Sequence, residues 1–200
     1  MFIGNFLALK QRNIKRLLAY SSITHLGYLL VAFIVSGPSA TEAVMYYLCA
    51  YILTSMSAFG VVSVCSSSTL QLYTLDEYRG LFWTRPWLAA MFTASLLSLA
   101  GIPLTAGFIG KYLIISAGAG SAQWMLLVIL VINSAIGIYY YLRVVVAMYL
   151  EPGGDAGDAR AIEAMPIAGG IVLAVLTLGV VWLGVSPSAV IDLIRSAFPL

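Results

Sequence analysis

Three titratable residues, Lys111, His25 and Lys15, lie in or beside apolar stretches of this chain. Lys111 follows Gly107-Phe108-Ile109-Gly110 and has no acidic residue within thirty positions on either side. Holding an ammonium group in such surroundings is costly, so an ionisable residue inside a membrane is a candidate for function. The chemistry that suits an amine and an imidazole in this setting is the transfer of protons or ions.

His25 lies about eleven residues into its apolar segment, about 17 Å along a helix and near the middle of a bilayer. Ser21, Ser22 and Tyr28 are three or four positions away and share its helical face, and so does Lys15. This polar stripe predicts a proton relay. The plainer interpretation is a neutral imidazole bonded to a neighbouring helix and a Lys15 that snorkels to the headgroups.

The apolar region from Pro86 to Gly118 predicts two short helices with an interruption around Lys111. Its 33 residues would form a straight helix of about 50 Å, longer than a hydrocarbon core of about 30 Å. Two full spans would need about 40 residues and a turn. Gly101-Ile102-Pro103 marks one break, and Gly118-Ala119-Gly120-Ser121 marks a second. Interrupted helices beside a charged group recur in proteins that move ions.

The composition is that of an integral membrane protein. Of 200 residues, 62% are hydrophobic and 9% are charged, and the mean hydropathy is +0.99, whereas soluble domains are about 25% charged. The pattern predicts one all-α, polytopic membrane domain over residues 1–200 with about six transmembrane segments. The predicted segments are 14–35, 41–66, 86–102, 104–118, 123–150 and 167–185, with 67–85 as an interfacial connection.

Residues 1–9 are too few for a span, which needs about 20 residues. We expect them to be the end of a preceding helix, and the chain to be a fragment or half of a split subunit. Six spans would divide the basic residues unequally between the two sides, and the positive-inside rule would place the larger group in the cytoplasm. That group is Lys10, Arg12, Lys15, Arg16, Arg79, Arg85 and Arg195, against Arg143 and Arg160 on the other side.

Several other kinds of site are not indicated by the sequence. It holds no glycine-rich phosphate loop, no paired carboxylates and no Ser/His/Asp set. Cys49 and Cys65 lack metal-ligand spacing and are interpreted as packing residues, and no basic cluster with aromatic residues predicts nucleic-acid binding. Tyr139 to Tyr141 with Arg143 predict an interfacial belt, and Asn133 predicts an interhelical contact.

A set of motifs resembles the antiporter-like subunits of respiratory complex I, the bacterial NADH–quinone oxidoreductase. The motifs occur in order and the resemblance covers essentially the whole chain. They are NIKRLLAYSSITHLGY (13–28), YRGLFW (78–83), LSLAGIPLTAGFIGK (97–111) and SAIGIYYYLRV (134–144).

The resemblance implies a fourteen-helix subunit with two inverted five-helix repeats, each with a half-channel and a lysine on a broken helix. This chain would supply the end of helix eight, the second repeat and the last helix. Lys111 would be the lysine of the broken helix twelve, and Lys15 and His25 would be polar positions of helix nine. Together they would carry protons along the hydrophilic axis of the membrane, coupled to quinone reduction elsewhere.

The resemblance also implies what lies outside this chain. NADH, FMN, iron–sulfur clusters and quinone would be bound elsewhere in the enzyme, and this chain would hold no metal and perform no redox chemistry. Its partners would be other membrane-arm subunits and the lipid of the bacterial inner membrane, without nucleic acid. The first repeat of the family, with its carboxylate and lysines, would lie outside this chain. Two alternatives stay open: a module of a multisubunit cation/proton antiporter, and a structural fragment.

Overall fold

The computed structural model describes residues 1–66, 73–151 and 167–197. These parts are helical and contain no strand beyond one isolated bridge between Asn13 and Thr74, which confirms the predicted all-α fold. The elements are α1 (Phe2–Lys10), α2 (Ile14–Val35), α3 (Pro38–Cys65), the 3-10 helix η1 (Leu75–Tyr78), α4 (Leu81–Thr84), α5 (Pro86–Ala100), α6 (Ala106–Gly120), α7 (Trp124–Tyr149), α8 (Ile167–Val185) and α9 (Ser188–Ala197).

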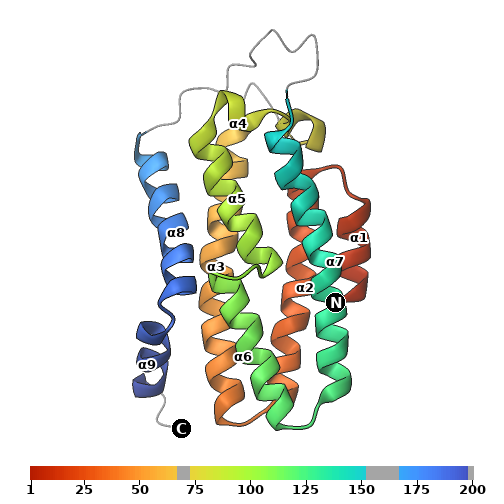
Figure 1. Cartoon of the computed structure of the whole chain (residues 1–200), viewed down its shortest axis with the longest axis vertical. Helices are drawn as coiled ribbons and strands as arrows, with labels where there is room; N and C mark the ends of the chain where they lie inside the picture. The colour runs from red at the N-terminus through yellow and green to blue at the C-terminus, as the bar shows by residue number, and fades with distance from the viewer. Residues whose placement is uncertain (67–72, 152–166, 198–200) are drawn as a thin grey trace.

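The long helices run side by side along the bundle, and α5 and α6 stack end to end as one interrupted helix (Figure 1). Among the described residues, α2, α3, α7 and α8 are each long and apolar enough to cross a membrane. Helices α5 and α6 have 15 residues each, or about 22 Å, so neither spans a bilayer alone. Together they make one crossing, although the sequence predicted a separate segment for each.

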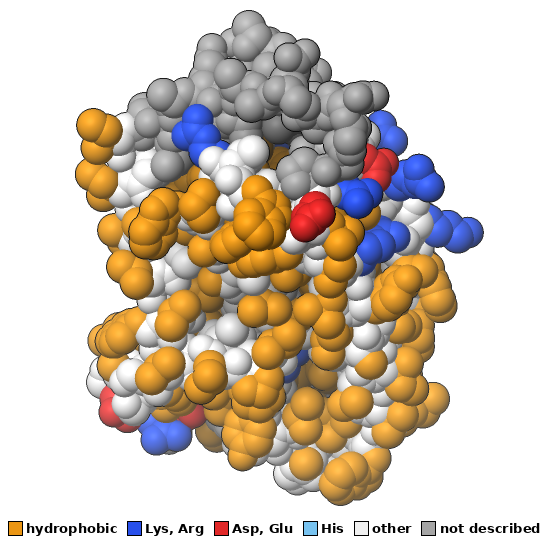
Figure 2. Space-filling model, turned by 45° about the horizontal axis from the view of Figure 1, so that its top comes forward, with side chains coloured by type: hydrophobic (Ala, Val, Ile, Leu, Met, Phe, Trp, Pro, Cys, Tyr) orange, Lys and Arg blue, Asp and Glu red, His pale blue; other side chains and the backbone are white. Residues whose placement is uncertain are grey.

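Because α5 and α6 make one crossing and not two, each later segment of the chain lies on the side of the membrane opposite to the predicted one. Helix α7 ends near the α1–α2 connection, where Arg143 donates to Leu9 O and Gln11 O, whereas α9, whose Arg195 pairs with Glu42, lies at the opposite end of the bundle (Figure 1). The predicted sides of Arg143 and Arg195 were therefore wrong, and Arg160 lies outside the described residues. Figure 2 shows lysine and arginine side chains gathered toward the first end, above a largely hydrophobic flank.

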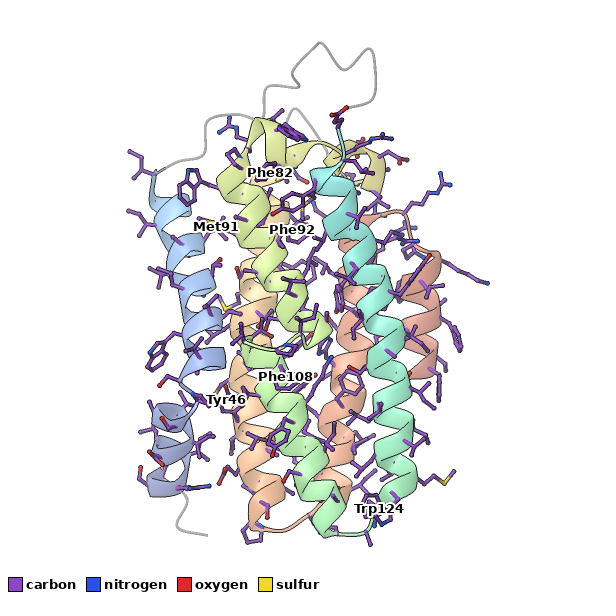
Figure 3. The ribbon with its side chains drawn as sticks, viewed as in Figure 1. Tyr46, Phe82, Met91, Phe92, Phe108 and Trp124 are labelled. Atoms are coloured by element: carbon purple, nitrogen blue, oxygen red, sulfur yellow. The ribbon has the colours of Figure 1, made fainter. Side chains whose placement is uncertain are left out.

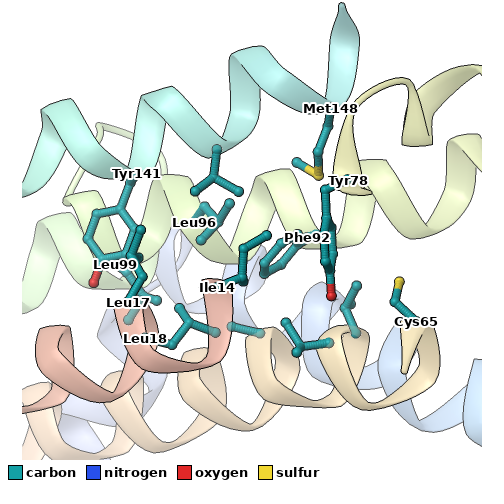
Figure 4. Close-up of a cluster of buried hydrophobic side chains, with 14 of the residues drawn as sticks. Ile14, Leu17, Leu18, Cys65, Tyr78, Phe92, Leu96, Leu99, Tyr141 and Met148 are labelled. Carbon is teal, nitrogen blue, oxygen red and sulfur yellow. The ribbon is translucent and has the colours of Figure 1, made fainter. Parts of the chain in front are cut away.

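The largest buried cluster joins α2, α3, α5 and α7 (Figure 4). Ile14, Leu17, Phe92 and Met148 are almost completely buried in it. The outward faces are also apolar, as a lipid-facing surface requires. Figure 3 shows Phe82 and Trp124 near opposite ends of the bundle, where aromatic side chains suit the headgroup level.

Proline and glycine residues set the start of α3 and the end of α5. Helix α3 begins at Pro38 rather than at the predicted Thr41, because a proline at the first helical position loses no hydrogen bond. Helix α5 ends at Ala100 and is capped by Gly101, whose φ of 81° is the left-handed conformation that glycine adopts at little cost. Pro103 then prevents the chain from continuing the same helix.

Arg143 fastens α7 to the turn between α1 and α2. Its two Nη atoms donate to the carbonyl oxygens of Leu9 (3.1 Å) and Gln11 (2.6 Å). Arg143→Met is expected to destabilise the detergent-solubilised protein by about 2 kcal/mol, because two charge-assisted hydrogen bonds are lost. The fall in Tm would be compared with that of Arg195→Met, which breaks only an exposed pair with Glu42. Equal shifts for the two variants would contradict this role.

Candidate functional site

Lys111 lies in the second turn of α6, only 6% exposed, and reaches back across the interruption. Its Nζ donates to the carbonyl oxygens of Leu99 (3.1 Å) and Ala100 (2.8 Å) and to Ser134 Oγ on α7 (3.0 Å). The last carbonyls of a helix lack partners within it and carry partial negative charge, so they suit an ammonium group. The interrupted helix predicted around Lys111 is therefore present, and the lysine caps its first half.

Small residues allow the two halves of the interrupted helix to approach closely. A Cβ on Gly107 would overlap the carbonyl oxygen of Ser98, and the Gly107 amide donates to Ser98 Oγ (3.1 Å). A Cβ on Gly110 would lie 2.7 Å from the ring of Tyr47. At both positions the structure shows close packing.

His25 is buried near the middle of α2 between two phenols. Its Nδ1 lies 2.6 Å from Tyr47 Oη, and its Nε2 lies 3.2 Å from Tyr141 Oη. The ring of Tyr51 stacks on the imidazole at a centroid distance of 5.0 Å. Both ring nitrogens are thus occupied by hydroxyl groups that can donate or accept. The imidazole can take a proton on one side and give one on the other.

Lys15 is not brought to this cluster. It lies in the first turn of α2, partly buried, with its Nζ 4.3 Å from the centroid of the Tyr73 ring. Ten positions separate it from His25, about 15 Å along the helix. Its role in proton transfer stays a prediction.

A polar network that the sequence did not single out joins α1, α2 and α7. Asn5 Nδ2 donates to the Oδ1 (2.9 Å) and the carbonyl oxygen (2.8 Å) of Asn133. Asn5 Oδ1 accepts from Thr24 Oγ1 (3.2 Å) and Tyr140 Oη (3.1 Å). Asn133 was predicted as an interhelical contact, but its partner Asn5 was missed. The available signal was an amide within the apolar run of residues 1–9.

The tyrosine run on α7 does not form the predicted belt. Tyr140 and Tyr141 are each 1% exposed, and only Tyr139 (61%) faces outward. Consecutive helical residues are turned about 100° apart, so three adjacent tyrosines cannot share the outer face. The buried pair instead contributes hydroxyl groups to the polar interior.

These groups form one buried polar region. Lys111 Nζ is 5.2 Å from the centroid of the Tyr28 ring, and the same ring packs edge-on against His25, with their centroids 5.6 Å apart. A small cavity of about 10 Å³, enough for about one water, lies between His25 and the interruption. Amine, imidazole and hydroxyl groups in this arrangement can pass protons. Among the described residues, no cluster of His, Cys, Asp and Glu could hold a metal ion.

The sequence profile of a family described as "NADH:quinone oxidoreductase/Mrp antiporter, TM" matches residues 1–137. The chain belongs to this family. It is 50% identical over 200 residues to "NADH-quinone oxidoreductase subunit N" of Ectopseudomonas mendocina, covering 98% of this chain and 40% of that protein. It is 51% identical over 198 residues to subunit N of Chromohalobacter salexigens, covering 98% of this chain and 41% of that protein. The chain thus spans about two fifths of the length of these relatives.

A solved relative shows the same fold. A chain of respiratory complex I from Thermus thermophilus with bound aureothin superposes with a TM-score of 0.81 at 34% identity, over 96% of this chain and 42% of that one. The multi-pass, antiporter-like membrane fold predicted from the motifs is therefore confirmed.

The helix numbers that the resemblance implies for Lys111, Lys15 and His25 stay predictions. Within this chain, Lys15 and His25 lie on α2 and Lys111 lies on α6, and α3 and α5 come between these two helices along the chain.

Proposed function

We propose that this chain is part of a proton-translocating membrane-arm subunit of a bacterial NADH–quinone oxidoreductase, in the inner membrane. The observation that carries the proposal is the setting of Lys111. Its ammonium group is held at the interruption of a membrane helix by two backbone carbonyls and one hydroxyl. An amine bound by neutral groups alone is suited to take up and release protons in response to changes nearby.

His25 would be the second proton-carrying group. It is bracketed by Tyr47 and Tyr141, and the hydroxyl of Tyr141 belongs to the same helix as Ser134, the partner of Lys111. Lys15 would act at the end of the route, because it lies in the first turn of α2, where an ammonium group at a helix end can reach water. The positive-inside rule assigns this basic end to the cytoplasm.

Redox chemistry would take place in other subunits. NADH, FMN, the iron–sulfur clusters and quinone would be bound there, and this chain would respond to quinone reduction through its contacts with neighbouring membrane-arm subunits. A multisubunit cation/proton antiporter remains the alternative, since the matching family includes both branches. Identity of about 50% to subunit N over nearly the whole chain favours the redox enzyme.

Inverted membrane vesicles from cells with and without this chain distinguish the functions. We expect NADH addition to drive proton uptake, followed with a pH-sensitive dye, only where the chain is present and without a need for sodium. Sodium-dependent proton flux in the absence of NADH would support the antiporter. Failure of the chain to co-purify with any large membrane complex would indicate a structural fragment.

A further inference from the structure

Of the three groups that bind Lys111 Nζ, only one can reverse its hydrogen-bonding role. The ammonium group has three N–H donors, and the structure provides three acceptors: Leu99 O, Ala100 O and Ser134 Oγ. A backbone carbonyl can only accept a hydrogen bond, whereas a hydroxyl can accept or donate. When Lys111 becomes a neutral amine, it keeps two N–H donors and gains a lone pair, which needs a donor.

We propose that Ser134 is the residue through which Lys111 loses and regains its proton. The inference rests on the proposed function and names a residue that completes it. In the neutral state the two remaining N–H groups stay on the carbonyls, and the Ser134 hydroxyl turns to donate to the amine nitrogen. The Lys111 nitrogen then has a hydrogen-bond partner for each N–H group and for the lone pair in both charge states, without movement of α5, α6 or α7. The carbonyls hold the lysine in place, and the hydroxyl carries the proton.

The transfer balances as a single hydroxyl exchange. An N–H bond of Lys111 breaks as an O–H bond forms on Ser134, which lies 3.0 Å from the amine, and Ser134 passes its own hydroxyl proton to a water molecule. The hydroxyl is restored, the amine is left neutral and the water becomes hydronium. Uptake of a proton is the reverse.

Substitutions at Ser134 test the inference in the assembled complex. Ser134→Ala removes the hydroxyl. The side chains of Ser134→Thr and Ser134→Val have nearly the same shape, but only threonine keeps a hydroxyl. We expect NADH-driven proton uptake to fall about fivefold in the alanine and valine variants, below the usual loss for a proton-transfer group because water can partly substitute. The threonine variant should keep most of the activity. The slowed variants should also show a larger rate decrease in D₂O, as proton transfer becomes limiting.

Ser95→Ala is the matched control, because Ser95 is fully buried on α5 and its hydroxyl bonds to Ser57 (2.8 Å) and Met91 O (2.9 Å). We expect this variant to pump normally. Suppose that Ser134→Ala and Ser134→Val have the same rate of proton uptake as Ser95→Ala and the same rate decrease in D₂O, while Lys111→Ala pumps poorly. The inference is then overturned and the proposed function stands. If Lys111→Ala also pumps normally, the proposed function itself fails. If Ser134→Ala does not assemble, the threonine and valine pair decides.

Discussion

Lys111→Ala is expected to lower NADH-driven proton translocation about tenfold, because no other titratable side chain holds its position. The substitution removes the amine at the interruption and leaves Leu99 O, Ala100 O and Ser134 Oγ without this donor. NADH–quinone turnover should fall as well if the two processes are tightly coupled. Both rates would be measured in inverted vesicles at equal amounts of assembled complex.

Lys111→Arg separates the charge of this residue from its proton chemistry. A guanidinium group can still donate to the carbonyls at the end of α5, but it does not lose its proton in proteins. We expect Lys111→Arg to assemble and to translocate protons as poorly as Lys111→Ala. Lys10→Ala is the control, because Lys10 is exposed at the end of α1. Wild-type proton translocation by either Lys111 variant would contradict the role proposed for this lysine.

Lys111 and the interruption could be found from sequence because they break strong local rules. A charge in an apolar run and a Gly-Ile-Pro sequence within a helix are each costly, so each indicates a specific structural reason. The number of crossings could not be found in the same way. A largely apolar region of 33 residues fits one long interrupted crossing or two short ones, and only the end-to-end stacking of α5 on α6 decides between them.

The partners of Lys111 and His25 could not be predicted, because they come from helices distant in sequence. Ser134 is 23 positions from Lys111, and Tyr141 is 116 positions from His25. Periodicity shows which side of a helix is polar but not which helix faces it. Asn5 was missed for a related reason. A single amide in an apolar run gains meaning only when Asn133 is seen to bind it.

Gly107→Ala is expected to be the most damaging single-methyl change in the interrupted helix. The added Cβ would overlap the carbonyl oxygen of Ser98 and lie 2.8 Å from its carbonyl carbon. Backbone atoms cannot rotate away as a side-chain end can, so α6 must move off α5. We expect destabilisation by about 3 kcal/mol, seen as a Tm about 6–12 °C lower in detergent.

The same substitution tests whether the closeness of the two halves matters for function. Movement of α6 carries Lys111 away from the carbonyls of Leu99 and Ala100, so proton translocation should fall even in complexes that assemble. Gly120→Ala is the control within the same helix, since a Cβ there would meet no atom within 4 Å. Its Tm should be unchanged or slightly higher, because alanine favours the helix. A Gly107→Ala protein as stable and active as Gly120→Ala would show that α6 can separate from α5 without loss, and that the contact between Lys111 and the end of α5 is not what holds the proton site together.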